Sequence, residues 1–272
     1  MPESKPGSAL RLALILGALA LLSVIGYRVY SDRSSVALPA LATIPPPEAP
    51  VSPAEPQYPL PAAASSPALP PLPSLYDSDS DFLSALGELM SGDSLLLLLV
   101  REHLIERLVA SVDNLPNRRV TANILPLRPL GGSLLVESHG QEWLLSAQNG
   151  ERYRGPLEAL LQIDPAAVAQ HYRRWYPLFQ QAYRELGYQD RYFNDRLIFV
   201  IDHLLAAPEP DQPIILIASG GRYQFADADL ESASVGHKLM LRLGLESSRR
   251  LKVWLADLRS LLIAPPPADA AG

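Results

Sequence analysis

The chain has 272 residues, of which 27 are proline and none is cysteine, and its 23 Lys and Arg against 29 Asp and Glu give a net charge of −6 at pH 7. The absence of cysteine excludes disulfides, thiolate nucleophiles and cysteine-ligated metal centres. The acidic balance argues against a nucleic-acid partner, because such binding depends on Lys and Arg that neutralise phosphates.

The first distinct segment of the chain is apolar. Residues 12–27 carry no charge and would span roughly 24 Å as a helix. Arg11 and Arg28 flank them, and their apolar stems allow both charged groups to reach the membrane interface. We therefore predict a transmembrane helix, a signal anchor, over residues 10–30. The alternative is a cleavable signal peptide, although no small-x-small cleavage site directly follows the apolar residues.

Positive charge is nearly balanced across this segment, with Lys5 and Arg11 before it and Arg28 and Arg33 after it. The free amino terminus adds positive charge to the N-terminal side, and positive residues favour the cytoplasmic side. We expect residues 1–9 in the cytoplasm and an inner-membrane protein with a periplasmic C-terminal domain.

A proline-rich linker is predicted over residues 31–74. Between Pro39 and Pro73 there are 13 prolines in 35 residues. Proline fixes φ and lacks a backbone donor, so this tract favours polyproline II over helix or sheet. We interpret it as a semi-rigid spacer. The alternative is a ligand for a partner that binds polyproline II segments.

Residues 75–263 have a globular composition and are enough for a single domain with a full core. Apolar periodicity predicts a short helix that ends near residue 90 and a longer, central helix from residue 93 or 94 to 114, ended by Pro116. Asp164 before Pro165 is a strong helix start, for a helix that ends before Gly187. Further helices are predicted over residues 192–206, 234–243 and 246–263, with a disordered tail over 264–272.

Two small β elements interrupt the helices. Residues 134–138 and 142–146 flank His139-Gly140-Gln141, a pattern typical of a β-hairpin. Residues 214–218 and 223–225 flank a second glycine-containing turn. The predicted fold class is therefore mainly α, of α+β type, with one or two small β-hairpins.

The chain contains no common catalytic signature, since the GxSxG, HExxH, GxxxxGK[ST] and GxGxxG patterns are all missing from the sequence. We predict neither a cofactor nor a metal site.

The predicted helix over 192–206 carries five polar candidates. Asp195 and Asp202 are seven residues apart and share one face, while Arg196 and His203 share the adjacent face, and Asn194 lies beside them. These groups could form a carboxylate and imidazole acid–base site that lines a cleft. Alternatively, they cap or pair with neighbouring helices inside the domain.

Two further pairs are candidates for binding. Asp113 and Asn114 end the central helix, where such side chains can bind the backbone of a turn. Tyr176 and Gln180 belong to a stripe of aromatic and amide side chains at helical spacing. That stripe could be a platform for a sugar or peptide, or part of the core.

Several short blocks of the predicted domain are distinctive together. They are VDNLP at 112–116, YPLFQQAY at 176–183, ELGY at 185–188, FNDR at 193–196, VIDHLL at 200–205, FAD at 225–227 and SVGHKLMLRLG at 234–244. In this order they resemble one family, the proteobacterial family catalogued as domain of unknown function 3014. The resemblance covers about residues 75–262 and implies an envelope setting, with an N-terminal membrane helix and a Pro-rich spacer, but no activity, substrate or site residues.

Two functional hypotheses follow. The first is a single-pass membrane protein whose periplasmic domain is a noncatalytic binding or scaffolding module, with partners in the inner membrane through residues 10–30 and an envelope protein or the cell wall. The second is a tethered envelope hydrolase that uses Asp195, Asp202 and His203. Convergence of these three side chains in an open pocket would favour the hydrolase, whereas separate pairing would favour the binding module.

Overall fold

The computed structural model describes residues 55–60, 70–89, 98–120, 124–128, 134–140 and 142–263. The predicted transmembrane helix over 10–30 and the predicted tail over 264–272 lie outside these residues. Within the described ranges, no helix combines the length and the apolar character that crossing a bilayer requires.

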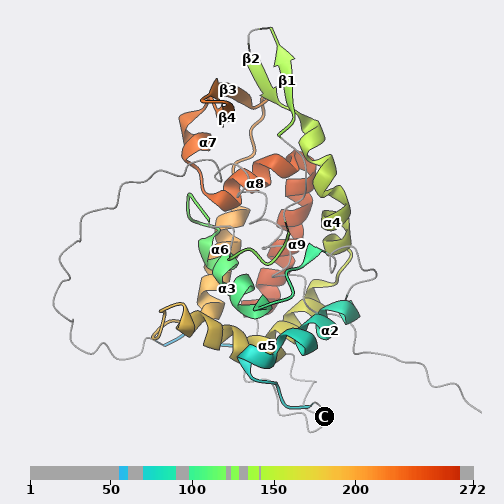
Figure 1. The fold of residues 1–272 in the computed structure, drawn as a ribbon, viewed down its shortest axis with the longest axis vertical. Coiled ribbons are helices and arrows are strands. Elements are labelled where there is room, and N and C mark those ends of the chain that lie inside the picture. The colour runs from blue at the N-terminus through green and yellow to red at the C-terminus, as the bar shows by residue number, and fades with distance from the viewer. Residues whose placement is uncertain are drawn as a thin grey trace, which may run out of the picture.

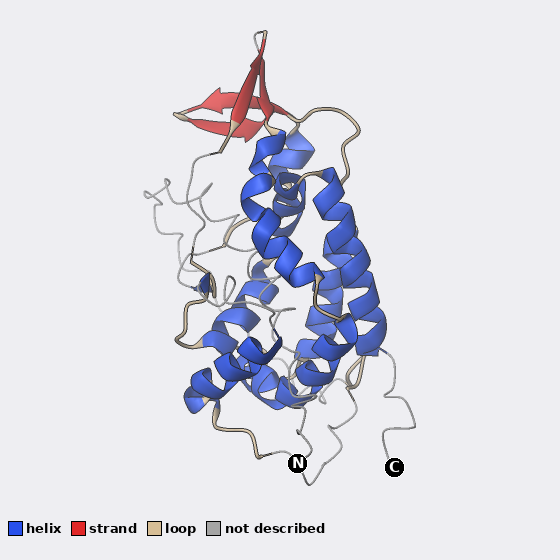
Figure 2. Cartoon of the chain, turned by 90° about the vertical axis from the view of Figure 1, so that its right-hand side faces the viewer, coloured by secondary structure: helices blue, strands red, loops and turns tan. Residues whose placement is uncertain are grey.

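The described part of the chain is a mainly helical domain with a small four-stranded antiparallel sheet at one end (Figures 1 and 2). Its eight α-helices are α2 (Asp79–Leu89), α3 (Leu104–Asn114), α4 (Glu151–Leu161), α5 (Pro165–Glu185), α6 (Phe193–Leu205), α7 (Ala228–Ser232), α8 (Val235–Leu243) and α9 (Leu245–Ile263). Two short 3-10 helices, η1 (Leu75–Asp77) and η4 (Ala147–Asn149), precede α2 and α4. The predicted mainly helical fold with small β-hairpins is confirmed for the described residues.

The core lies between the long helices. Helix α9 packs against α4, α5, α6 and α8, while α3 packs against α5 and α6. On α3 the apolar residues fall at helical spacing, and Leu104, Leu108 and Val112 are almost fully buried. Phe82 brings α2 onto α5, where its ring lies edge-on to Trp175 at a centroid distance of 5.0 Å.

The two predicted hairpins are confirmed and join into one sheet. The strands β1 (Val136–His139), β2 (Glu142–Leu145), β3 (Ile215–Ser219) and β4 (Arg222–Phe225) follow one another in that order, all antiparallel. The joining pair, β2 with β3, was not predictable from local patterns because its partners are some 70 residues apart in the chain. Leu216 and Phe225 pack with Leu241 of α8, so one sheet face covers the end of the helical bundle.

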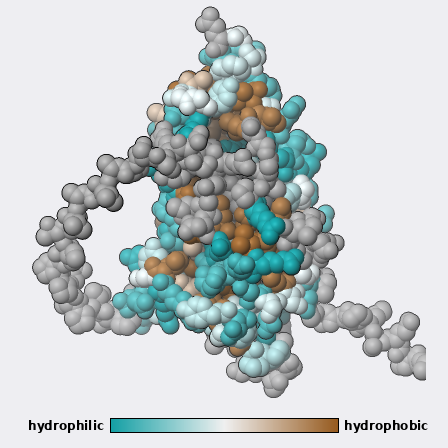
Figure 3. Space-filling view, in the orientation of Figure 1, coloured by the Kyte–Doolittle hydropathy of each residue, from teal (hydrophilic) through white to brown (hydrophobic). Residues whose placement is uncertain are grey.

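The other face of the sheet is exposed. Successive residues of a strand point to opposite sides, so Ile215 and Ile217 lie opposite the buried Leu216, with 39% and 49% of their surfaces exposed. Figure 3 shows hydrophobic residues on the viewed face both at the sheet end and near the middle of the molecule.

Local signals place α5 correctly. The Asp164 carboxylate accepts a hydrogen bond from the Ala166 amide at 2.9 Å, and Pro165 occupies the first turn, where its missing N–H is not needed. Gly187 follows the helix with a φ of +108°, a backbone conformation that favours glycine.

The predicted start of the central helix is wrong. Helix α3 begins at Leu104, whereas Leu99 forms an isolated antiparallel bridge with Leu127. The amide of Val100 donates to the carbonyl of Pro126 at 2.7 Å. A leucine run that is apolar on all sides fits a buried extended segment as well as a helix, because it has no period.

Helices α4 and α7 were missed. Glycine followed by proline is typical of a helix break, yet Gly155 and Pro156 both lie inside α4. The helix persists because Tyr153, Leu157 and Leu160 form a buried stripe at helical spacing.

Candidate functional site

Helix α6 carries five of the nine predicted site residues, and its polar side chains point to different parts of the molecule. Asn194 and Asp195 contact an N-terminal segment, Asp202 contacts α9, Arg196 contacts the end of α3, and His203 contacts the start of α8.

The N-terminal segment is residues 55–60, which we call the strap. One oxygen of the Asp195 carboxylate accepts from the Tyr58 amide at 2.8 Å, and the other accepts from the Gln57 amide at 3.0 Å. The Asn194 side-chain amide donates to the Tyr58 carbonyl at 2.8 Å. Composition placed these residues in the free linker, but here they lie on the surface of the domain.

Asp202 lies on the same face of α6 as Asp195 and contacts Arg259 of α9. The two side chains form a bidentate ion pair, in which Nη2 of Arg259 lies 3.0 Å from Oδ2 of Asp202. The hydrogen bond to Asp202 raises the pKa of the Arg259 guanidinium, and the Tyr58 hydroxyl of the strap adds to this effect. Two helices therefore surround Tyr58 of the strap: α6 binds its backbone through Asp195, and α9 places Arg259 near its hydroxyl.

The adjacent face of α6 fastens other helices. Arg196 donates from Nε to Oδ1 of Asp113 at 2.8 Å and from Nη2 to the Asp113 carbonyl at 2.6 Å. The Tyr188 hydroxyl donates to the second Asp113 oxygen at 3.0 Å. With exposed side-chain fractions of 10% for Asp113 and 24% for Arg196, this is a largely desolvated ion pair that links α3 to α6.

His203 belongs to a polar cluster at the start of α8. Its Nε2 lies 2.7 Å from Oγ of Ser234, the residue that caps α8, and its ring stacks on His237 at a centroid distance of 4.0 Å. Burial lowers the pKa of His203 to about 4, with repulsion from His237 and Arg196 as smaller causes. The ring is therefore neutral at pH 7.

The remaining candidates have structural contacts. The Tyr176 hydroxyl donates to Oε1 of Gln180, which also accepts from the Phe193 amide at 2.9 Å. Burial raises the pKa of Tyr176 to about 12. Asn114 donates back to the Ala110 carbonyl at 2.8 Å, which supports the predicted role in ending α3.

The comparison with protein families matches residues 104–259 to a family described as protein of unknown function (DUF3014). The chain belongs to this family. Neither the curated proteins nor the solved structures contain a match.

In this DUF3014 protein the family match begins at the first residue of α3 and ends inside α9. It therefore includes α6 and each of the helices that α6 contacts, whereas the strap precedes it. Sequence reasoning missed Tyr58, Arg259 and Ser234 as partners of the α6 residues. Only Ser234 had a local signal, since a serine before an apolar run is typical of a helix N-cap.

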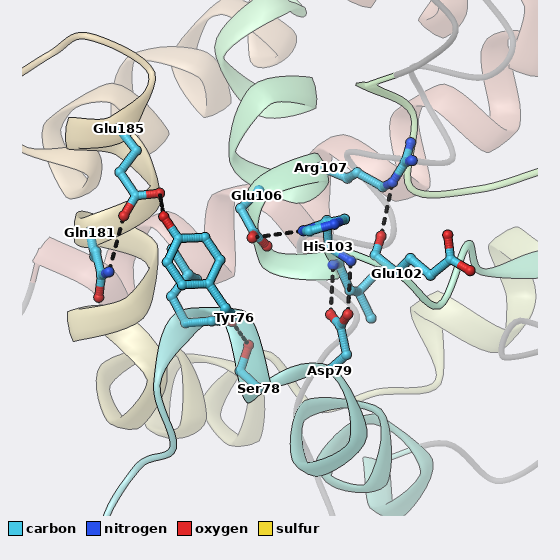
Figure 4. Close-up of polar contacts among 11 residues, drawn as sticks. Tyr76, Ser78, Asp79, Glu102, His103, Glu106, Arg107, Gln181 and Glu185 are labelled. Atoms are coloured by element: carbon cyan, nitrogen blue, oxygen red, sulfur yellow. Dashed lines mark hydrogen bonds and ion pairs between the residues drawn. The ribbon is translucent and has the colours of Figure 1, made fainter.

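A second N-terminal contact lies near the strap in sequence and also precedes the match (Figure 4). Asp79, in the first turn of α2, accepts from the amides of His103 and Leu104, each at 2.8 Å. His103 has a φ of +53°, which costs energy for a residue with a side chain, and the Asp79 carboxylate holds it there. The hydroxyl of Tyr76, in η1, donates to the carboxylate of Glu185, at the end of α5, at 3.0 Å.

Among the described residues, no group of three or more His, Asp or Glu side chains is arranged to hold a metal ion. A pocket between the sheet and α8 has a volume of about 10 Å³, room for about one water molecule. It is lined by Leu134, Leu145, Leu216, Tyr223, Phe225, Glu231, Lys238 and Arg242.

Proposed function

We propose that this protein is a single-pass, membrane-anchored cell-envelope protein whose periplasmic domain is a noncatalytic binding or scaffolding module. The membrane anchor and the periplasmic location rest on the sequence of residues 10–30. The noncatalytic role is supported by one observation above all: the five polar side chains on α6 are bonded to four separate segments of the same chain.

A hydrolase would need a general acid and a general base within reach of one substrate atom. Asp195 instead accepts two backbone amides, Asp202 is paired with Arg259, and His203 is bonded to Ser234. None of these contacts joins one of the three side chains to another. The arrangement favours the binding module over the tethered hydrolase.

In-cell photo-crosslinking tests the binding role. A photoreactive residue can replace Ile217 on β3, Phe199 on α6 or Val253 on α9, which are 49%, 53% and 64% exposed. A binding module should give one envelope component, identified by mass spectrometry, from positions that lie on one surface. Failure of all three positions to give a discrete adduct, in a domain that stays folded by circular dichroism, would contradict the proposal.

The proposed orientation has a separate test. We expect an alkaline phosphatase fused after Gly272 to be active, because this enzyme folds only in an oxidising compartment such as the periplasm. A green fluorescent protein that folds only in the cytoplasm is the matched fusion. Fluorescence of the second fusion without activity of the first would place the domain in the cytoplasm and overturn the orientation.

A further inference from the structure

The contacts of the strap are of a kind that recognises an extended peptide. All three hydrogen bonds from Asn194 and Asp195 go to backbone groups of Gln57 and Tyr58. A single carboxylate that accepts two successive amides fixes the direction and the conformation of the bound backbone. Hydrogen bonds to a charged group are stronger than those between neutral groups.

The sequence of the strap matches this pattern of donors. Residues 55–60 read Glu-Pro-Gln-Tyr-Pro-Leu, so the two amides that bind Asp195 lie between Pro56 and Pro59. Proline has no N–H and restricts the chain to an extended form before binding. A Pro-x-Tyr-Pro segment therefore offers its donors only where Asp195 accepts them, and loses little entropy when it is bound.

The side chains of the strap add selectivity. Burial alternates along it, with Pro56, Tyr58 and Leu60 half-buried and the residues between them exposed. Tyr58 and Leu60 pack against the main hydrophobic core. The Tyr58 hydroxyl accepts from Nε2 of Gln57 at 3.2 Å. Arg259 is paired with Asp202, on the same face of α6 as Asp195, and the Tyr58 hydroxyl helps to raise its pKa. We call Asn194, Asp195 and Arg259 the cradle. Together with the apolar surface under Tyr58, the cradle offers acceptors and a donor for the backbone and a cation near the tyrosine hydroxyl.

The cradle also has unused hydrogen-bonding capacity. Asn194 is 1% exposed, and its Oδ1 has no hydrogen-bond partner among the described residues although its Nδ2 binds the strap. A buried acceptor without a partner destabilises a fold. An unpaired Asn194 Oδ1 beside the strap is more typical of a binding surface than of a hydrophobic core.

We propose that Asn194, Asp195 and Arg259 form a binding site for an extended Pro-x-Tyr-Pro peptide, and that the strap is the resident ligand of this site in the same chain. This inference deepens the proposed binding role and rests on it, since it names the ligand class and the site. Any partner that presents the same pattern has to displace the strap.

Hydrogen exchange in the full chain tests the resident state. The strap has four backbone amides, those of Glu55, Gln57, Tyr58 and Leu60, and the exchange of the Gln57 and Tyr58 amides is followed because these two bind Asp195. We expect Asp195→Ala to raise the exchange rate of these two amides at least tenfold. Asp164→Ala is the matched control, because it removes a carboxylate that caps another helix, and it should leave the strap amides unchanged.

Binding of a synthetic peptide tests the ligand class. The probe is a peptide with the sequence of residues 53–62, and the protein is the full chain with Gln57→Pro and Tyr58→Pro, which removes both strap donors without changing the cradle. A tethered competitor has an effective concentration in the millimolar range. We expect the peptide to bind this variant about tenfold more tightly than it binds the control Glu55→Pro.

Adding Asp195→Ala to the strap-released variant should abolish peptide binding. Equal affinity of the peptide for the released variant and the control would overturn the proposal, as would strap amides that exchange equally in the wild type and in Asp195→Ala. Failure here leaves the crosslinking result intact, so a partner found elsewhere on the domain would preserve the binding role without this site. Conversely, peptide binding without any crosslinked partner would preserve the site and contradict the wider role.

Discussion

Four aspartates of this domain, Asp79, Asp164, Asp195 and Asp227, accept hydrogen bonds from backbone amides. Asp164 and Asp227 cap the helices that follow them, which is a local contact within three residues. Asp79 and Asp195 differ, because each lies in the first turn of its own helix and accepts two consecutive amides from a distant segment. A negative charge near a helix N-terminus is itself favourable. The same residue type therefore stabilises its own helix and holds a second segment in place.

Asp113 gives a test at the scale of a residue. Replacing it by alanine removes the carboxylate that accepts from Nε of Arg196 and from the Tyr188 hydroxyl in a largely desolvated site, and keeps only the backbone bond to Nη2 of Arg196. We expect the free energy of unfolding to fall by about 2–3 kcal/mol. The control is Arg154→Ala, which removes an ion pair with Glu151 whose side chains are 66% and 56% exposed. Arg154→Ala should lower the free energy of unfolding by less than about 1 kcal/mol in urea denaturation. An equal loss of stability in the two variants would contradict the importance of the desolvated Asp113 ion pair.

At the scale of an element, the start of α8 is fixed by close backbone contact with the end of α3. The amide of Val235 donates to the Asn117 carbonyl at 2.8 Å, and that of Gly236 donates to the Leu115 carbonyl at 2.9 Å. A Cβ atom at Gly236 would lie 2.7 Å from Cδ2 of Leu204 and 3.2 Å from the Leu115 oxygen. Glycine is therefore required here by space and not by an unusual φ.

Two of the helical glycines, Gly155 in α4 and Gly236 in α8, predict opposite effects for the same substitution. Gly236→Ala should destabilise the domain by about 1–3 kcal/mol, because the methyl group pushes α8 away from α3 and α6. Gly155→Ala in α4 meets nothing within 4 Å and should stabilise it by about 0.5–1 kcal/mol through helix propensity. Thermal unfolding of both variants checks the signs, and a stabilised Gly236→Ala would show that the helices do not pack this closely.

Sequence patterns predicted the elements whose signals are local. The proline after Asp164 marked the start of α5, and glycine-containing turns marked both hairpins. The start of α3 was wrong because the leucine run before Leu104 has no period and its bridge partner, Leu127, is distant in sequence. The pairing of β2 with β3 is likewise a contact between segments that are distant in sequence. Helical spacing carries no information on such contacts.

For the candidate site, too, the sequence predicted the local arrangement but not the long-range contacts. The spacing of Asp195 and Asp202 correctly placed them on one face of α6, with Arg196 and His203 on the next. Their partners were not predictable, because the Asp195 contact spans 137 residues to Tyr58 and the Asp202 contact spans 57 residues to Arg259. Spacing gives the face that a residue occupies, but only the tertiary fold gives what covers that face.

At the scale of the whole molecule, the strap joins the linker to the end of the domain that lies opposite the sheet (Figure 1). A spacer that is fastened at Gln57 and Tyr58 is shorter than composition suggests. Freeing residues 55–60 would add about 19 Å of reach at ~3.1 Å per residue. A peptide that displaces the strap from the proposed site would therefore increase the distance that the domain can reach from its predicted membrane anchor.

The stability of the whole domain should fall in mild acid. Burial lowers the pKa of His203 and of His171 from 6.5 to about 4 in the folded protein, whereas both titrate near 6.5 in the unfolded chain. Between pH 6.5 and 4 the unfolded chain binds more protons than the folded domain. The free energy of unfolding therefore decreases as the pH falls through this window.

Both histidines are only about half-buried, so solvent screening reduces the effect to about 1–2 kcal/mol for each. Urea denaturation between pH 7.5 and 4 should show this loss, and His203→Gln should remove about half of it, because glutamine can bond to Ser234 but does not titrate in this range. His139→Gln, at the exposed end of β1, should keep the full slope. If the free energy of unfolding of His203→Gln depended on pH as it does in the wild type, the His203 ring would not control the acid sensitivity of the fold.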